Sequence, residues 1–120
     1  AKVSAAQRAE FSRLLWAYLR KRESLLCLFA LIDVRHEPLA QDLAFLGQLA
    51  AAGVPFAILF TKADKLSNAQ LQRALASYRR RLAQDWEPLP PHFVTSAETG
   101  LGKAEVLAFI AEALPHFKAP

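Results

Sequence analysis

The sequence has little of what would mark a secreted, disulfide-bonded or membrane-spanning protein. Cys27 is its single cysteine, so neither an internal disulfide nor a thiolate metal site can form, and we expect this residue in the core. No apolar stretch approaches the ~18 residues that span a bilayer, because Asp33 ends the longest run, Leu25–Ile32. No signal peptide is visible at the start. These absences predict a cytoplasmic protein that does not enter a membrane.

The composition is that of one folded domain over residues 1–120. Hydrophobic residues are 53% and charged residues 22%, which fits a globular rather than a disordered chain. The net charge is +4, and the basic residues gather in two runs, Arg20–Arg22 and Arg79–Arg81. Either these runs are cations at helix ends, where they suit the helix dipole, or they form a face for an acidic partner such as RNA. Composition does not separate the two explanations.

Hydrophobic periodicity predicts alternating helices and strands. The expected elements are a helix over 5–22, a strand over 25–32, a helix from Pro38 to Gly53, a strand over 54–60, a helix from Ser67 to Leu82, a strand over 92–95 and a helix over 102–114. This order predicts an α/β domain of three α/β/α layers around a parallel sheet with right-handed crossovers. The wholly apolar strand 25–32 is expected in the centre of the sheet, buried on both faces.

Finer patterns mark helix starts and inward faces. Ser4–Gln7 and Ser67–Gln70 have the capping-box pattern. The side chains expected to face inward are Leu39, Leu43, Leu46 and Ala50 in the second helix, Leu71, Leu75, Tyr78 and Leu82 in the third, and Val106, Leu107, Ile110 and Leu114 in the last.

Two polar loops, Thr61–Asp64 and Thr95–Gly100, follow the second and third expected strands. Ligands of parallel sheets bind outside the carboxyl ends of the strands, so both loops should face the same side. The Asp64 carboxylate could accept two parallel N–H bonds from one edge of a guanine, while the Lys62 stem lies along the ring. The alternative is an ordinary turn in which Asp64 bonds local amides.

These residues resemble known motifs. Thr61-Lys62-Ala63-Asp64 resembles the [N/T]-K-x-D guanine-specificity motif of GTPases, and Ser96–Gly100 resembles their fifth motif. Together with Leu31–Pro38, they make the whole chain similar to the EngB-type (YihA/YsxC) bacterial GTPases. The resemblance implies GTP or GDP binding with Mg²⁺, slow hydrolysis, assembly of the large ribosomal subunit through its RNA, and normal cell division and septation.

The resemblance also implies roles for single residues. Asp64 would accept from the guanine N1–H and 2-amino groups, and Lys62 would pack over the base and ribose. Ala97 would offer its backbone N–H to guanine O6, with Thr95 and Ser96 shaping the loop. Thr61 stands where many GTPases have Asn, and Ala63 is the variable position of the motif.

The chain departs from a complete GTPase in one large respect. It has no G-x-x-x-x-G-K-[ST] phosphate loop and no Asp-x-x-Gly switch motif, which would supply the phosphate cradle and the Mg²⁺ ligands. The hypothesis is that residues 1–120 are the C-terminal portion of a GTPase domain, without the N-terminal phosphate-binding half. The sequence therefore does not decide whether this chain alone is an enzyme. An open sheet edge could lead to a dimer.

Other chemistry has less support. His36, His92 and His116 lack the spacing of metal ligands, and we expect an exposed loop or surface role for each. Asp33 and Arg35, at a strand end, are expected to form an ion pair that orders the loop. The alternative to a guanine-nucleotide protein is a non-catalytic α/β interaction module whose loops match the motifs by accident.

Overall fold

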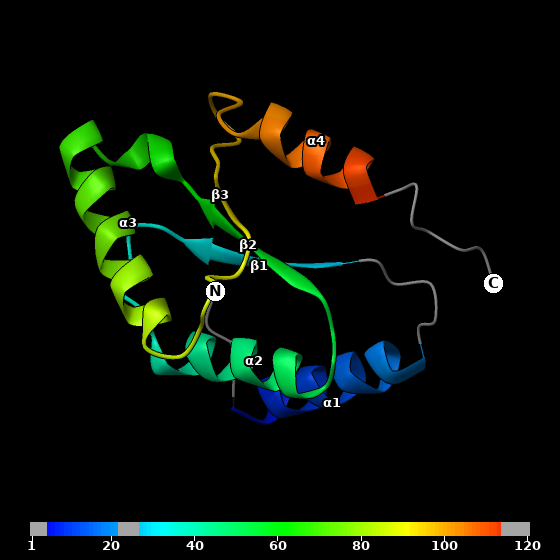
Figure 1. Ribbon diagram of the computed structural model, residues 1–120. Coiled ribbons are helices and arrows are strands. Elements are labelled where there is room, and N and C mark those ends of the chain that lie inside the picture. The colour runs from blue at the N-terminus through cyan, green and yellow to red at the C-terminus, as the bar shows by residue number, and fades with distance from the viewer. Residues whose placement is uncertain (1–4, 22–26, 114–120) are drawn as a thin grey trace.

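The computed structural model describes residues 5–21 and 27–113, and the order of elements is the predicted one (Figure 1). The elements are α1 (Ala5–Lys21), β1 (Leu28–Asp33), α2 (Ala40–Ala51), β2 (Phe56–Thr61), a 3₁₀ turn (Ala63–Lys65), α3 (Asn68–Ala83), β3 (His92–Val94) and α4 (Lys103–Ala113). Ser4 of the first expected capping box, Arg22, Leu114 and His116 lie outside the described residues.

The three strands form a parallel sheet in the order β1-β2-β3. The central strand is therefore β2, and the expectation that the first strand is central and buried on both faces is wrong for the described residues. Leu31 in β1 is 69% exposed, whereas its neighbour Ile32 is 6% exposed. Successive side chains of a strand point to opposite faces, so one face of β1 is covered and the other is largely open.

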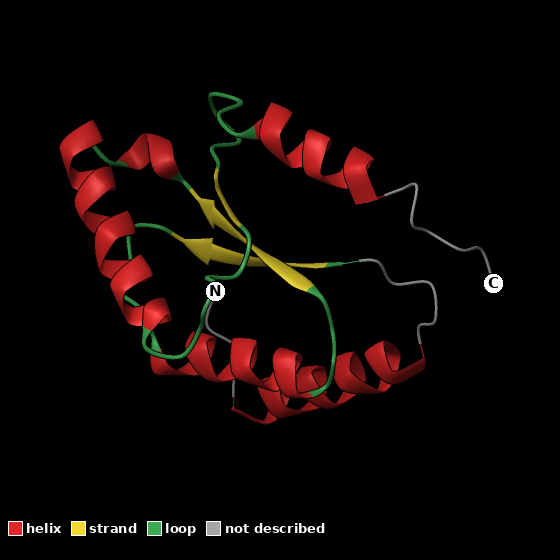
Figure 2. Cartoon of the chain, viewed as in Figure 1, coloured by secondary structure: helices red, strands yellow, loops and turns green. Residues whose placement is uncertain are grey.

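Helices cover the sheet unequally and give three layers (Figure 2). On one face, α2 and α3 pack onto the sheet. Almost no solvent reaches Leu46 and Leu49 of α2, Leu82 of α3, or Ile58 and Phe60 of β2 beneath them. On the other face α4 contributes Phe109, whose ring lies 6.1 Å from that of Phe29 and 5.2 Å from that of Phe93. Helix α1 packs against α2, where the rings of Trp16 and Phe45 are 6.1 Å apart.

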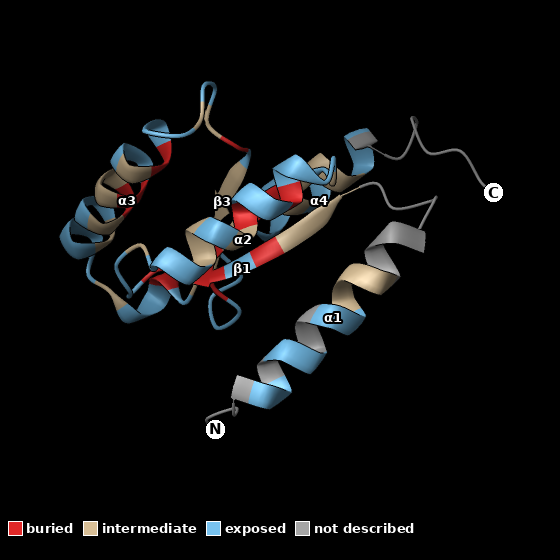
Figure 3. Ribbon diagram, turned by 90° about the horizontal axis from the view of Figure 1, so that it is seen from below, coloured by how far each residue is buried: buried red, intermediate tan, exposed pale blue. Residues whose placement is uncertain are grey.

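The inward faces of the helices were predicted well for α3 and less well elsewhere (Figure 3). Leu75, Tyr78 and Leu82 are buried as expected. Leu39 is 43% exposed, because it is the N-cap of α2 rather than a residue of its buried stripe. Leu107 is 54% exposed, because α4 covers only part of its face of the sheet.

The structure also tests three local predictions: the capping box of α3, the burial of Cys27 and the absence of a membrane span. The capping box of α3 is confirmed: Ser67 Oγ accepts from the N–H of Gln70 at 3.2 Å, and Gln70 Oε1 accepts from the N–H of Ser67 at 2.9 Å. Cys27, expected in the core, is only half-buried just before β1. Within residues 5–21 and 27–113, no helix has the length and apolar character needed to cross a membrane.

Candidate functional site

The two polar loops meet at the carboxyl ends of β2 and β3, as the sequence predicted. The N–H of Ala63 donates to the carbonyl of Thr95 at 3.1 Å, and the N–H of Thr95 donates to the carbonyl of Phe60 at 2.7 Å. Thr95 Oγ1 donates to the same Phe60 carbonyl at 3.1 Å. Backbone and side-chain bonds thus extend the pairing of β2 with β3 into the loops and fix one loop against the other.

Asp64 is held by the second loop. Ser96 Oγ donates to Asp64 Oδ1 at 2.7 Å, across 32 residues of sequence. Ser96 is 3% exposed and its Oγ also accepts from the N–H of Thr99 at 3.2 Å. The hydrogen bond from Ser96 lowers the pKa of Asp64, with a smaller contribution from Lys65, whose Nζ is 3.7 Å from Oδ2. The carboxylate is therefore ionised at neutral pH, and its shortest bond is to the other loop rather than to a local amide.

Lys62 has an unusual backbone conformation. With φ 63° and ψ 33° it is left-handed, and it is the one non-glycine residue with positive φ among the described part of the chain. A left-handed L-residue costs about 1–2 kcal/mol, so the surrounding contacts have to maintain it. On one side, Thr61 Oγ1 donates to the carbonyl of Ile32 at 3.4 Å. On the other, the N–H of Lys65 donates to the carbonyl of Lys62 at 3.0 Å.

Asp33 and Arg35 form the ion pair that the sequence predicted. The guanidinium of Arg35 donates from Nε to Asp33 Oδ1 at 3.0 Å and from Nη2 to Oδ2 at 2.7 Å, and its backbone N–H donates to Oδ1 at 3.0 Å. These bonds, with the side-chain bond first, hold the pKa of Asp33 far below its usual range. His36 Nε2 and Lys62 Nζ lie 3.8 and 3.9 Å from Oδ2.

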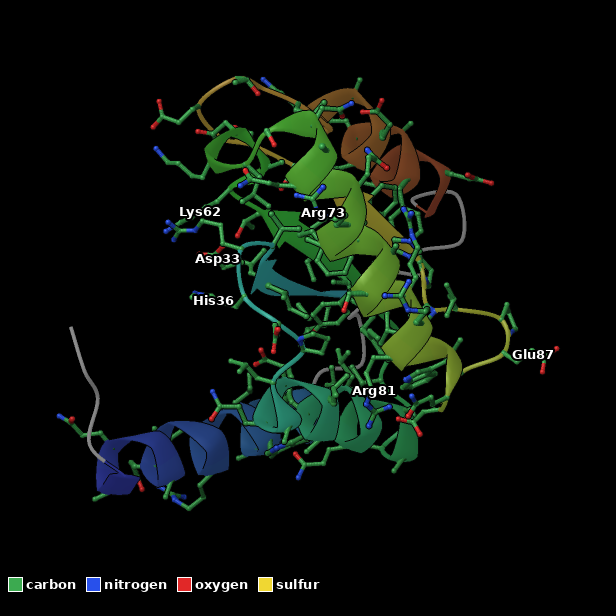
Figure 4. All side chains as sticks on the ribbon, turned by 90° about the vertical axis from the view of Figure 1, so that its left-hand side faces the viewer. Asp33, His36, Lys62, Arg73, Arg81 and Glu87 are labelled. Atoms are coloured by element: carbon green, nitrogen blue, oxygen red, sulfur yellow. The ribbon has the colours of Figure 1, made fainter. Side chains whose placement is uncertain are left out.

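The contact between Asp33 and Lys62 was missed by the sequence reasoning (Figure 4). The signal that could have found it is the strand register, which pairs Asp33 with Thr61, the residue before Lys62. A polar residue that ends one parallel strand lies beside the loop that leaves its neighbour.

Two glycines shape the second loop. Gly100 was predicted as the last residue of the loop motif and residue 102 as the start of the last helix, but the need for glycine at these positions was not predicted. The N–H of Gly100 donates to the carbonyl of Ser96 at 2.9 Å, with φ +78° at Gly100. Gly102 has φ +80°, and a Cβ built there would overlap the carbonyl oxygen of Val94. The loop can therefore return to the end of β3 only with glycine at position 102.

A cavity of about 320 Å³ opens beside this loop on the α4 face of the sheet. Its lining includes Thr95, Ser96 and Ala97 of the second loop, together with the apolar side chains of Leu59, Val106 and Leu107. The first loop does not line it, so the predicted site residues border the cavity from one loop only. In the described residues no group of three or more His, Cys, Asp or Glu could hold a metal ion.

His92 differs from the exposed surface role expected for it. It is half-buried in β3, and its ring lies 6.0 Å from that of Phe60. Its Nε2 accepts from Arg79 Nε at 3.1 Å and its Nδ1 lies 2.9 Å from the carbonyl oxygen of Pro90. Because side chains of a strand alternate between the two faces of the sheet, His92 lies on the α3 side, next to Phe60 and Arg79. A strand of three residues is too short for the sequence to show which side chains face inward. His36 is exposed, as predicted.

No family model matches the chain. Solved structures of translation elongation factor SelB from Methanococcus maripaludis have the same fold. The form in complex with the GTP analogue GPPNHP superposes with a TM-score of 0.68 at 18% identity, covering 91% of this chain and 24% of that one. For the apo form the TM-score is 0.64 at 21% identity, over 78% of this chain and 20% of that one. The described part of the chain therefore has the fold of part of these elongation factors.

Sequence comparison gives the particular family. The chain is 46% identical over 110 residues to the probable GTP-binding protein EngB of Porphyromonas gingivalis and 43% identical over 112 residues to that of Cytophaga hutchinsonii. These matches cover 92% and 93% of this chain, but 55% and 56% of the relatives. The chain belongs to the EngB family of GTP-binding proteins and spans about half the length of the curated relatives it matches. Similarity over that length leaves no basis for an accidental match of short motifs.

Proposed function

We propose that this chain forms the guanine-recognition part of a GTP-binding protein of the EngB type. The observation that carries the proposal is the 2.7 Å bond by which Ser96 of one loop holds the Asp64 carboxylate of the other. A fixed, ionised carboxylate accepts only, so it matches the two donors on one edge of guanine. Adenine lacks the 2-amino donor and would leave this acceptor without a partner.

The remaining residues of the two loops have supporting roles in this proposal. Among the described residues the backbone N–H of Ala97 has no hydrogen-bond partner, so it is free to donate to guanine O6. The stem of Lys62 covers the ring and the ribose. Thr61, Ala63 and Thr95 hold the loops together by the bonds to Ile32 and Phe60 and between Ala63 and Thr95.

Mg²⁺ and the phosphates belong to the wider proposal. Resemblance to the family favours GTP hydrolysis with Mg²⁺ in the full-length protein, meaning a protein that carries this chain and has the length of its relatives. Since the described residues do not form a metal cluster, we assign no residue of this chain to Mg²⁺ or to the phosphates. We also place the full-length protein in the cytoplasm.

Base specificity tests the proposal. In the full-length protein, Asp64→Asn replaces an acceptor by a donor that opposes the guanine 2-amino group and suits the 2-oxo group of xanthine. Affinity for GTP should fall about tenfold or more while affinity for XTP rises, in line with the cost of a mismatched buried polar group. Competition titrations with GTP, XTP and ATP measure this.

The matched control is Glu98→Gln, an exposed carboxyl of the neighbouring loop without a hydrogen bond or ion pair to any described residue. It should leave all three affinities unchanged. A variant Asp64→Asn that keeps the full preference for GTP would refute Asp64 as the reader of the base.

We further propose that the basic surface of α3 contacts ribosomal RNA in assembly of the large subunit. Resemblance to the family also favours a role of the full-length protein in normal cell division and septation. Arg79 and Arg81 are engaged by His92 and Asp85. Arg73 and Arg80, two helical turns apart on the exposed side of α3, have no hydrogen bond or ion pair within the described part of the chain. They are therefore the cations that can reach phosphates at no internal cost (Figure 4 labels Arg73).

Salt dependence tests this second part. Each lost phosphate contact should make the log–log slope of ribosomal-particle affinity against salt shallower by about 0.7–0.9. We expect this for Arg80→Ser and a larger change for the triple replacement of Arg79–Arg81 by Ser. Arg13→Ser, which removes an exposed arginine paired with Glu10 on α1, is the control. An unchanged slope in the triple variant would assign the run to solubility.

The open edge of β1 has a proposed use as well. None of the described strands pairs with its outer side, and an exposed strand edge can pair with another strand. We propose that either the rest of the full-length protein or a second copy of the chain occupies it. Sedimentation of the 120-residue chain and of the full-length protein distinguishes these cases, because only the second gives a dimer of both.

A further inference from the structure

We infer that Asp33 is a positioning residue for the nucleotide, and that it acts through Lys62. Asp33 stands outside both guanine motifs, at the end of β1. The inference rests on the proposed function, since Lys62 is there the residue that covers the base.

The first step is that Asp33 itself does not move freely. Two guanidinium nitrogens and one backbone N–H of Arg35 bond its two oxygens at 2.7–3.0 Å. Its side chain is 20% exposed, half the exposure of Arg35. The carboxylate is thus a fixed negative charge at the end of β1, at the carboxyl edge of the sheet.

The second step is that Lys62 is directed toward this charge. Its Nζ lies 3.9 Å from Asp33 Oδ2, while its side chain is 55% exposed and has no other partner among the described residues. The left-handed Lys62 directly follows Thr61, the residue that the register of β1 and β2 pairs with Asp33. Strained backbone conformations cluster at binding sites, where they fix the direction of a side chain. The side chain of Lys62 is directed so that its ammonium approaches Asp33.

The third step concerns what this does for binding. A free lysine stem loses rotamer freedom when it is ordered over a ring, and that loss weakens binding. With its ammonium held at the end of β1, the Lys62 stem is ordered before the nucleotide arrives. Figure 4 shows Asp33 and Lys62 on the same edge, with His36 next to them. The ring of His36 also lies 3.8 Å from Asp33 Oδ2 and is 63% exposed. His36 belongs to the loop after β1, however, and we assign it no contact with the base.

The test is a double-mutant cycle for GDP affinity in the full-length protein. Asp33→Asn removes the charge and keeps the shape, while Lys62→Met keeps the stem and removes the ammonium. Each single change should weaken GDP binding about two- to fivefold, as expected for a partly exposed ion pair. The double variant should be no weaker than Lys62→Met alone, since Asp33 acts only through the ammonium. Effects that multiply, or Lys62→Met binding like wild type, would overturn the inference.

A ligand-free measurement separates this inference from the proposed function. The Nζ resonance of Lys62 in the NMR spectrum should shift in Asp33→Asn and stay in place in Asp85→Asn, which breaks the 2.9 Å ion pair with Arg81 on α3 instead. A shift without any guanine preference in the wild type would reject the proposed function and leave the contact standing. A guanine preference that depends on Asp64, with no shift and no loss of GDP affinity in Asp33→Asn, would reject only the role of Asp33. The NMR comparison needs no nucleotide titration of Asp33→Asn. Lys62→Met changes an exposed side chain, so its GDP affinity can be measured even if Asp33→Asn is too unstable to titrate, and binding like wild type would still overturn the inference.

Discussion

The two faces of the sheet are built from the same strands but are covered very differently. On the face of α2 and α3, Ile32, Ile58 and Phe60 are 6%, 0% and 0% exposed. On the face of α4, Leu31 is 69% exposed, and Leu107 of α4 itself is 54% exposed. Ile32 and Leu31 are neighbours of similar hydrophobicity, so the difference comes from the helices above them. Burial is therefore a property of the partner element, and exposed apolar side chains gathered on one face mark a surface that can take a further partner.

The largest effect should come from emptying the covered face. Phe60 is fully buried, with its ring 5.0 Å from that of Tyr78. Phe60→Ala should lower the free energy of unfolding by about 3–5 kcal/mol, because it removes buried apolar surface and leaves a cavity. Urea denaturation of wild type and variant measures it. A loss below about 1 kcal/mol would mean that this face repacks, contrary to the dense packing of a protein interior.

The same two faces explain how much of the fold could be predicted. Alternating apolar runs and capping boxes are local, and they gave the order of elements, the capping box at Ser67 and the buried side of α3. The place of β1 at an edge is not local, since a run of apolar residues looks the same whether one helix layer or two cover it. Position 107 was misjudged for the same reason.

The site was predicted in its parts but not in its connections. Motif residues at the ends of β2 and β3 were expected on one side of the sheet, and the structure brings Asp64 and Ser96 into contact. The approach of Lys62 to Asp33 depends on strand register, which no single stretch of sequence encodes. The requirement for glycine at 102 depends on where Val94 ends its strand, again a tertiary fact.

The next largest loss of stability is expected at Gly102, in the loop beside the cavity on the α4 face. Gly102→Ala puts a methyl group into the carbonyl of Val94 at positive φ, and we expect a loss of at least about 2 kcal/mol, more than the 1–2 kcal/mol of a left-handed alanine alone. The control is Gly53→Ala, which has φ +73° but open space around its Cβ and should cost only about 1 kcal/mol. Thermal unfolding of both variants checks this, and equal losses would show that the Val94 contact relaxes freely.

A smaller effect is expected at the start of α3, which covers the closed face. Ser67→Ala removes the side-chain bond to the N–H of Gln70 and should lower the free energy of unfolding by about 1 kcal/mol. Ser67→Asp keeps an acceptor at the N-cap and should restore most of that loss. If both variants unfold at the wild-type urea concentration, the capping box does not contribute to stability.

Acid should reveal a smaller contribution from the open end of β1. Because the pKa of Asp33 is lowered in the folded state by the bonds from Arg35, protonation weakens the fold. The contribution is present above the unfolded pKa of about 3.9 and fades as pH falls below it. The stabilities of wild type and Asp33→Asn should therefore differ at pH 6 and converge at lower pH, which urea titrations at several pH values would measure. A gap that stays constant down to pH 2 would mean that the Asp33–Arg35 pair contributes nothing through its charge.

The smallest effect is expected where the comparison began, at Leu31. In the 120-residue chain, Leu31→Ala removes atoms that already face solvent, so the free energy of unfolding should change by no more than about 0.5 kcal/mol. If the full-length protein covers this face, the same substitution there should cost about 2–5 kcal/mol, as for a buried leucine. Ile32→Ala, on the covered face in both proteins, is the control and should be costly in each. Urea denaturation of both proteins measures the four differences. A small and equal effect of Leu31→Ala in both proteins would show that the second face of β1 stays exposed in the full-length protein. The unequal burial of the two faces would then be a property of the complete fold and would not arise from studying the 120-residue chain alone.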